Sequence, residues 1–448
     1  MPPVRRGGIA RKRIWCAVTL GWACVVPVHA GQVDFGVGLS FAHNSNIKRV
    51  EENPQSDWTE GAMAGLTYRE STADVTARAL AQVERRHFVR NSFSDDTSGF
   101  LDGAAVWRIL PRRFTWSVED TFRQVLLDVT APDTISNRAE SNSLNTGPDL
   151  TFALSSTNSV EIGARYGRFD IEHSTADNRR YTVFGRGVHA LSAQTKLSLN
   201  YEAARAYFET GAQPFPRIFR QDWFGRFENL SAVNSTIVDL GTTRVTREGG
   251  EPLNGRLARL TLSQAFSSQS AVRLALSDQF SDTYSDLIRG VTSSTAPADT
   301  SVVVVVPGAN FASGDLYDNK RGDLAYVNND GRFGYTLQAY GRRVDFVTLE
   351  NNDYHEKGGK FVWTWNSGVM RFNASWDYTR RTFESDRQDT DRNYGASVAF
   401  SVNRNVTVSV QGGHSERLST ARSSSSLDNR FVLLLGYSSG FFDVQSRR

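Results

Sequence analysis

The stretch Met370–Thr379 reads MRFNASWDYT and the stretch Phe333–Tyr340 reads FGYTLQAY, so apolar and polar residues alternate in both. Successive side chains of a β-strand point to opposite faces, and this alternation therefore predicts strands with one apolar and one polar face. The same period recurs in about twenty segments after Gln32, most of them roughly 11 to 14 residues long. Strands of a soluble β-sandwich are usually about 5–6 residues long, whereas a tilted membrane-spanning strand needs about 9–11. The segment length thus favours a membrane barrel.

The gaps between these segments alternate as well. Short gaps such as Ser267-Ser268 are followed by longer polar ones such as Leu126–Asn142 and Asp282–Asp315. Short turns at one end and long loops at the other are typical of outer-membrane β-barrels. We therefore predict an all-β fold, a transmembrane antiparallel β-barrel of about 20 strands with short periplasmic turns and long extracellular loops. A barrel of about 18 strands is the alternative, because the apolar alternation is poor in 221–229 and 234–245.

Residues 1–30 have the layout of a secretory signal peptide, with basic residues before the apolar run Ile14–Val26 and a small-residue cleavage site at Val28-His29-Ala30. We expect residues 31–448 to form one barrel domain in the outer membrane of a Gram-negative cell. Residues 1–30 hold five of the 51 basic residues and no acidic ones, which leaves 46 basic against 48 acidic residues, a net charge of −2. This balance gives no reason to expect a nucleic-acid partner. Cys16 and Cys24 leave with the signal peptide, so the mature chain has no thiol chemistry.

Outer-membrane lipid is the first partner that the apolar register predicts. The first strand follows the cleavage site closely, so we expect neither an N-terminal plug domain nor a passenger domain. A barrel of this size without a plug should enclose water, because porins of about 16–18 strands already do. The longest loop, Asp282–Asp315, contains the apolar run Val302–Val306. We expect this loop to fold into the barrel mouth as a lid, with a β-extension above the membrane or poor order as alternatives.

The sequence has no His-Glu-x-x-His and no phosphate-binding loop, and its thiols lie in the first 30 residues. We therefore expect no enzyme activity, no catalytic residues and no cofactor. The six histidines that remain after cleavage are scattered along the chain. Asp386, Asp389 and Asp391 lie close together, but they lack the glycine and the final glutamate of a calcium loop. We interpret them as a solvated loop and predict no metal site.

Charged side chains on the register that faces the lumen are the best candidate functional residues, because charges inside a barrel determine which ions or polymers pass. The alternative interpretation is that arginines and acids on neighbouring strands pair with one another and stiffen the wall. The candidates are Arg78, Arg123, Arg165, Arg186, Arg259, Arg273, Arg332, Arg342, Arg371, Glu119, Glu161, Glu202 and Asp377.

The opening strand is followed by Ala42–Ile47, which reads AHNSNI, and then by Asp57 and the strand that contains Ala64-Gly65-Leu66. This opening resembles that of the outer-membrane barrels encoded with exopolysaccharide systems, including those associated with PEP-CTERM protein sorting. The resemblance implies a conduit for exopolysaccharide export, with exopolysaccharide and periplasmic export components as partners. A general porin for small polar solutes and a non-transporting structural or adhesive surface barrel are the alternatives. The same strand cadence continues in Ser141–Leu154, Ser159–Phe169 and Arg180–Tyr201.

Overall fold

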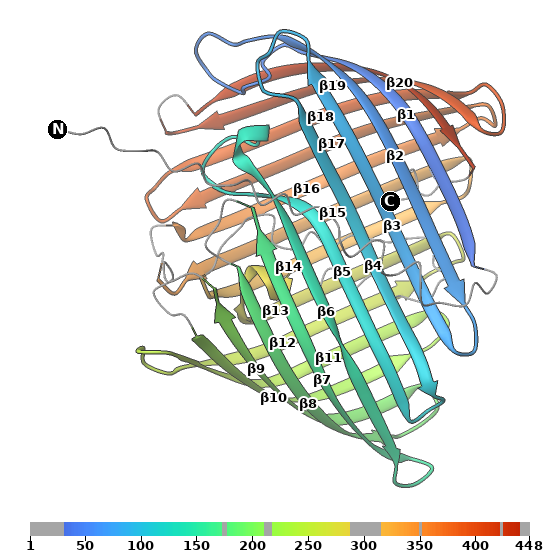
Figure 1. Cartoon of the computed structure of the whole chain (residues 1–448), viewed down its shortest axis with the longest axis vertical. Helices are drawn as coiled ribbons and strands as arrows, with labels where there is room; N and C mark the ends of the chain where they lie inside the picture. The colour runs from blue at the N-terminus through green and yellow to red at the C-terminus, as the bar shows by residue number, and fades with distance from the viewer. Residues whose placement is uncertain are drawn as a thin grey trace, which may run out of the picture.

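The computed structural model describes residues 31–172, 177–209, 217–286, 315–348, 352–421 and 424–439, which form one antiparallel sheet of 20 strands (Figure 1). The expected signal peptide in residues 1–30, His173 and Val302–Val306 lie outside the described residues. The strands are β1 (Gln32–Asn44), β2 (Asp57–Ser71), β3 (Val75–Phe88), β4 (Asp96–Leu110), β5 (Phe114–Leu126), β6 (Arg138–Ala153), β7 (Asn158–Ile171), β8 (Asn178–Ala190), β9 (Thr195–Phe208), β10 (Arg217–Leu230), β11 (Asn234–Arg247), β12 (Leu253–Ala265), β13 (Ser270–Ser281), β14 (Tyr317–Asn329), β15 (Phe333–Phe346), β16 (Tyr354–Asn366), β17 (Met370–Phe383), β18 (Gln388–Ser401), β19 (Val406–Ser419) and β20 (Ser426–Ser438).

Each strand pairs with the one before it, and β1 pairs with β20 from Gly36↔Ser438 to Asn44↔Arg430. This last pairing closes the sheet into a barrel without a free edge, as lipid requires, because an unpaired backbone group in hydrocarbon has no partner. The predicted strand count of about twenty is confirmed. The segments 221–229 and 234–245, in which the apolar alternation is poor, are both strands. They correspond to β10 and β11, which pair from Ile218↔Arg247 to Leu230↔Ser235.

The connections alternate in length as predicted. At one end the strands are joined by tight turns, such as residues 330–332 between β14 and β15. Gly331 in that turn has a φ of +85°, a conformation in which glycine carries no steric penalty. All the long connections lie at the other end, and because the strand number is even, β1 begins and β20 finishes at the end with the short turns.

The two faces of the wall differ as the alternation predicts. On β1 the side chains of Phe35 and Leu39 are 48% and 61% exposed, whereas Gly36, Gly38 and Ala42 on the opposite register are buried. A closed barrel that turns its apolar side chains outward has the architecture of an outer-membrane β-barrel, in which lipid covers that face. No helix in the described ranges is long and apolar enough to cross a membrane.

Three strands begin at least three residues earlier than the sequence pattern predicts. β10 starts at Arg217 rather than at 221. β6 starts at Arg138, within the expected gap Leu126–Asn142, and β18 starts at Gln388 rather than near Asp391. The outward register of the pieces added to these two strands is polar: Arg138, Glu140 and Asn142 in β6, Gln388 and Thr390 in β18. The outer face of a strand that extends beyond the lipid meets water, so no apolar alternation marks it.

Candidate functional site

The candidate site is the inner wall of the barrel together with its outer mouth, the end with the long loops. The pairing register places the predicted lumen residues on the inward face. On β8, for example, Val183 is 55% exposed outside, and Arg186, three residues later, points inward and faces Glu161 of β7. All the predicted residues except Arg332 lie within strands on this register; Arg332 lies in the turn before β15. Their effect on passing cargo stays a prediction.

Several of the predicted arginines form ion pairs along the inner wall, which is the arrangement that the alternative interpretation expects. Arg186 and Glu161 are the pair in which both partners were predicted, with Nε and Oε2 2.7 Å apart. Asp239 lies between Arg226 and Arg259, at 2.6 and 2.9 Å from their Nε atoms. The other predicted arginines with a carboxylate partner are Arg78 with Asp102 (3.8 Å), Arg165 with Asp149 (2.7 Å) and Arg342 with Asp286 (3.1 Å).

The remaining predicted residues have other surroundings. Glu119 accepts a hydrogen bond from Asn145 Nδ2 at 3.1 Å, and Arg371 Nε donates one to Asn366 Oδ1 at 2.9 Å. The guanidinium of Arg332 lies over the ring of Phe333, 5.6 Å from its centroid. Four more residues occupy the inward register of β5, β13, β9 and β17: Arg123, Arg273, Glu202 and Asp377.

Sequence analysis missed most of the carboxylates that neutralise the wall. Asp102, Asp149 and Asp239 all lie on the inward register of their strands, so strand parity alone would have found them. Asp286 lies instead in the single helical turn 283–286 that follows β13. Strand periodicity carries no information about such a residue, and the partner of Arg342 could not have been found from the sequence.

The loop between β5 and β6, residues 127–137, is the main structural element of the mouth, and we call it the mouth loop (Figure 1). Its own hydrogen bonds shape it. Asn137 Nδ2 donates to the carbonyl oxygens of Asp128 and Pro132 at 2.8 and 3.1 Å, and Asn137 Oδ1 accepts from the backbone N–H of Asp128 at 2.9 Å. Burial opposes ionisation of Asp133, but the hydrogen-bonded guanidinium of Arg138 more than offsets it and lowers the pKa of Asp133.

The mouth loop is held by the far wall. Thr130 accepts hydrogen bonds at its carbonyl oxygen from Arg387 Nη2 at 2.5 Å and Arg417 Nη2 at 3.1 Å. Arg381 Nη1 of β17 donates to the carbonyl oxygen of Val129 at 3.3 Å. Because β5 and β6 are not neighbours of β17–β19, these contacts cross the barrel. The partly buried Leu126 and Val129 also pack against an apolar cluster on the far wall, made of Tyr317, Val344, Phe346, Tyr354 and Phe383.

The interpretation of Asp386, Asp389 and Asp391 as a solvated loop is wrong for two of these residues. Asp389 and Asp391 lie on β18, and the side chain of Asp389 is 0% exposed. Its carboxylate pairs with Arg387 at 3.0 Å and with Arg417 at 2.6 Å, the two arginines that hold Thr130. A buried charge needs such partners, so Asp389 orients the arginines that bind the mouth loop.

A second segment enters the barrel at the start of the loop that was expected to be a lid. Tyr284 is 6% exposed and packs in a cluster with the inward side chains Val125, Ala139, Phe169 and Ile171. Asp282 pairs with Arg180 of β8 at 3.0 Å. Burial opposes the charge on Asp282, but Arg180 and the N–H of Ser285 more than compensate, so its pKa is lowered. Residues 282–286 thus pack against the inner wall, whereas the rest of the expected lid lies outside the described residues. The mouth loop was not predicted.

Metal and histidine chemistry find no support in the described part of the chain. Those residues include no group of three or more His, Cys, Asp or Glu that could hold a metal ion. Three of the described histidines each contact a polar side chain: His87 lies 2.8 Å from Asp95, His189 lies 2.9 Å from Asn158, and His414 lies 2.8 Å from Asn429. The ring of His43 packs against that of Trp58, with centroids 4.7 Å apart.

No protein-family model and no curated protein match the sequence. Among solved structures, the chain is similar to the FrpB iron transporter from Neisseria meningitidis, with 9% identity, 90% of this chain and 81% of that one covered, and a TM-score of 0.45. The siderophore receptor PirA from Pseudomonas aeruginosa has 13% identity, 92% and 81% coverage and a TM-score of 0.43. OccK3 from the same species has 13% identity, 91% and 95% coverage and a TM-score of 0.37. Likeness at this level assigns no cargo.

Proposed function

We propose that this chain is an outer-membrane conduit for hydrophilic cargo, closed at its outer mouth in the present conformation. The observation that carries the proposal is the mouth loop, whose Thr130 carbonyl is bound by arginines of the far wall. A loop folded across a barrel whose inner register is polar serves to control passage. The contacts that hold it are hydrogen bonds and a small apolar cluster, so closure is reversible.

For the cargo we propose exopolysaccharide on its way out of the cell, as the resemblance of the segment Ala42–Ile47 implies. The character of the inner wall supports this choice. Arg186 with Glu161 and Arg165 with Asp149 leave hydrogen-bonding groups but little net charge. Such a wall suits a polymer of hydroxyl-rich sugars, because it offers polar contacts without holding an ion tightly.

A general porin for small polar solutes is the second candidate, and the same paired charges favour it. A neutralised wall admits small sugars and ions of either sign with little discrimination. An export conduit must pass a polymer, and a cell without it loses surface polysaccharide. A general porin must pass only small solutes, and a cell without it keeps its surface polysaccharide.

The test combines bilayers with cells. The purified, folded protein and a variant with a shortened mouth loop are compared in planar bilayers and in liposome-swelling assays with small neutral sugars. A deletion strain is assayed for surface polysaccharide. Loss of surface polysaccharide, together with channel block by purified host polymer, supports export. Sugar permeation with unchanged surface polysaccharide supports the porin. If neither protein conducts, the conduit proposal fails and a structural or adhesive barrel replaces it.

A further inference from the structure

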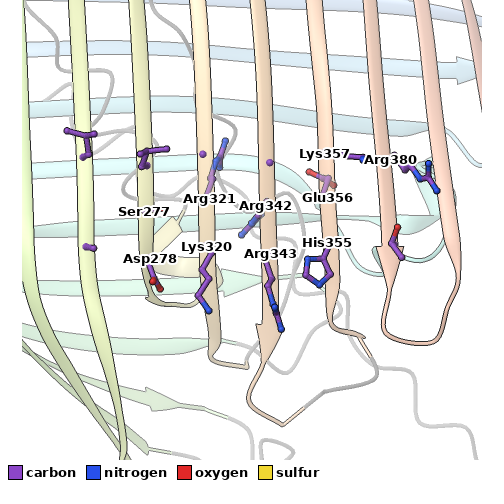
Figure 2. A pocket seen from close by; sticks show the side chains of 16 residues that line it. Ser277, Asp278, Lys320, Arg321, Arg342, Arg343, His355, Glu356, Lys357 and Arg380 are labelled. Carbon is purple, nitrogen blue, oxygen red and sulfur yellow. The ribbon is translucent and has the colours of Figure 1, made fainter.

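The outer face of the wall from β14 to β17 carries five basic side chains near its long-loop end. They are Lys320, Arg343, His355, Lys357 and Arg380, and they line a hollow of about 840 Å³. Figure 2 shows Lys320, Arg343 and His355 on three neighbouring strands, with Lys357 and Arg380 beside them. We call this feature the basic hollow. It lies outside the barrel and has no part in the inner wall or the mouth.

Like charges face one another in the basic hollow. Lys320 is directly opposite Arg343, and Lys357 is directly opposite Arg380. Like charges at directly opposed positions of an antiparallel pair destabilise the sheet. Such a pair is therefore not explained by the stability of the barrel unless carboxylates neutralise it.

Only part of this charge is neutralised within the chain. Lys320 pairs with Asp318 at 3.0 Å and Arg343 with Asp345 at 2.7 Å. Asp278 of β13 also lines the hollow, lies directly opposite Lys320 and pairs with Arg256 at 3.6 Å. Among the described residues Lys357 makes no ion pair, and Arg380 Nη2 donates to the uncharged Gln388 Oε1 at 2.6 Å. Positive charge thus remains at Lys357 and Arg380.

A comparable pair elsewhere on the outer face is neutralised. Arg168 of β7 is directly opposite Arg179 of β8. Arg168 pairs with Asp170 at 2.8 Å and Arg179 with Glu209 at 3.1 Å, so each guanidinium has its own carboxylate. The contrast indicates that the excess charge in the basic hollow serves an external anion.

The floor of the basic hollow is shaped for a bulky ligand with an apolar part. Gly322 and Gly341 lie directly opposite each other. A Cβ added at Gly341 would have no atom outside its immediate chain neighbours closer than 4.0 Å, so packing does not demand a glycine there. The missing side chain instead deepens the hollow. Leu260 and Leu276 line it, and the exposed Leu324 lies two residues from Gly322 toward the short-turn end.

We propose that the basic hollow binds the phosphate groups of a phosphorylated glycolipid in the outer leaflet, with its acyl chains against Leu260, Leu276 and Leu324. Charge-assisted hydrogen bonds from Lys357 and Arg380 hold the phosphate oxygens. The combination of basic side chains above an apolar floor selects a lipid over a soluble anion, which would gain nothing from the leucines. The proposal rests on the outer-membrane location in the proposed function, and it is independent of conduction.

Delipidated, folded protein in detergent is the material for the test, with retained lipid measured by native mass spectrometry. The probes are bisphosphorylated lipid A, the same lipid after enzymatic removal of its phosphates, phosphatidylglycerol and inorganic phosphate. We expect tight retention of bisphosphorylated lipid A and weak retention of the dephosphorylated form. The variant Lys357→Gln/Arg380→Gln should lower the affinity for bisphosphorylated lipid A at least about tenfold, the loss expected for one charge-assisted hydrogen bond.

Two further variants keep the test decisive. Gly341→Leu fills the hollow without changing a charge, and it should lower lipid A affinity as well. Arg168→Gln/Arg179→Gln removes two basic residues from the other side of the barrel and should bind like the wild type. Equal binding of dephosphorylated lipid A, equal competition by inorganic phosphate or by phosphatidylglycerol, or wild-type affinity in Gly341→Leu would overturn the proposal. Single-channel conductance of the same variants should be unchanged, so failure here leaves the proposed function standing.

Discussion

Arg417 of β19 donates a hydrogen bond from Nη2 to the carbonyl oxygen of Thr130 at 3.1 Å, although the two residues are 287 positions apart. The same Nη2 lies 2.6 Å from the buried carboxylate of Asp389. The arginine is therefore oriented by the wall before it meets the loop. Closure of the mouth thus depends on an ion pair that exists for the wall's own stability.

Replacing residues 128–136 of the mouth loop with a short Gly/Ser linker should raise single-channel conductance in planar bilayers. The replacement removes Val129 and Thr130 and leaves the ion pair of Arg417 and Asp389 intact, so the wall should still fold. A similar edit in the β11–β12 connection, residues 248–252, is the control and should leave conductance unchanged. Equal conductance of wild type and mouth-loop variant would show that this loop does not limit passage.

Glu161→Gln should shift the channel toward anions, because it leaves the inward guanidinium of Arg186 without its carboxylate. Arg186→Gln should shift it toward cations by the same reasoning. The measurement is the reversal potential across a salt gradient. Both shifts should shrink between about 0.1 M and 1 M salt, where the screening length falls from about 10 Å to about 3 Å. Identical reversal potentials for the two variants at low salt would show that this part of the wall does not face the ion path.

Acid should release the segment 282–286 from the wall. The pKa of Asp282 is lowered from 3.8 in the folded barrel, because Arg180 and the N–H of Ser285 outweigh burial. A carboxyl group whose pKa is lowered in the folded state stabilises that state at every pH above its unfolded-state pKa. This stabilisation is lost as the pH falls from the unfolded-state pKa through the folded-state pKa. Conductance should therefore rise reversibly below pH 3.8.

Asp282→Asn is the matched variant for this acid response. It lacks the titrating group and should already conduct more at neutral pH, with a smaller further rise in acid. Arg180 keeps its contact with Ser285 Oγ at 2.8 Å, so the variant removes the charge pair and little else. A wild-type conductance that stays flat at every acidic pH at which the barrel remains folded would contradict this role for Asp282.

Leu337→Arg should destabilise the barrel by about 2–4 kcal/mol, the cost of a basic side chain on the lipid face near the midplane. Leu337 is 48% exposed on the outer register of β15. Gln338, the next residue, faces inward opposite Lys360, and Gln338→Arg should cost much less. Urea or guanidinium unfolding in lipid vesicles measures both. Equal destabilisation by the two variants would contradict the assigned faces of this strand.

The strands could be predicted because alternate residues of a membrane-spanning strand face lipid and lumen, which gives a local apolar–polar alternation in the sequence. Val33, Phe35, Val37, Leu39 and Phe41 occupy every second position of β1, since lipid meets one face and water the other. The same rule explains the errors. At Arg138–Asn142 the outward side chains are polar, and the apolar alternation that marks a strand disappears.

The candidate site was predicted only in part, and for a related reason. The alternation of side chains along each strand predicted that Arg186 and Glu161 both face inward. They can contact each other because they lie on the neighbouring strands β7 and β8. The partner of Arg342 is Asp286, which lies in a helical turn outside any strand. Its position has no period, so no pattern in the sequence could point to it.

The sequence by itself determined the barrel, its strand count and the inward face of its charged residues, because these follow from a period of two repeated along each strand. Only the tertiary structure decided that Thr130 meets Arg387 and Arg417, and that Asp282 meets Arg180. Those contacts join parts of the chain whose strands are not neighbours, and the pairing of β1 with β20 closes the barrel so that opposite walls lie within reach of the loops. The arginines bind backbone carbonyl groups of the mouth loop, which every residue type has. No pattern of side chains in the sequence could therefore predict where the loop is held, and its position follows only from the folded barrel.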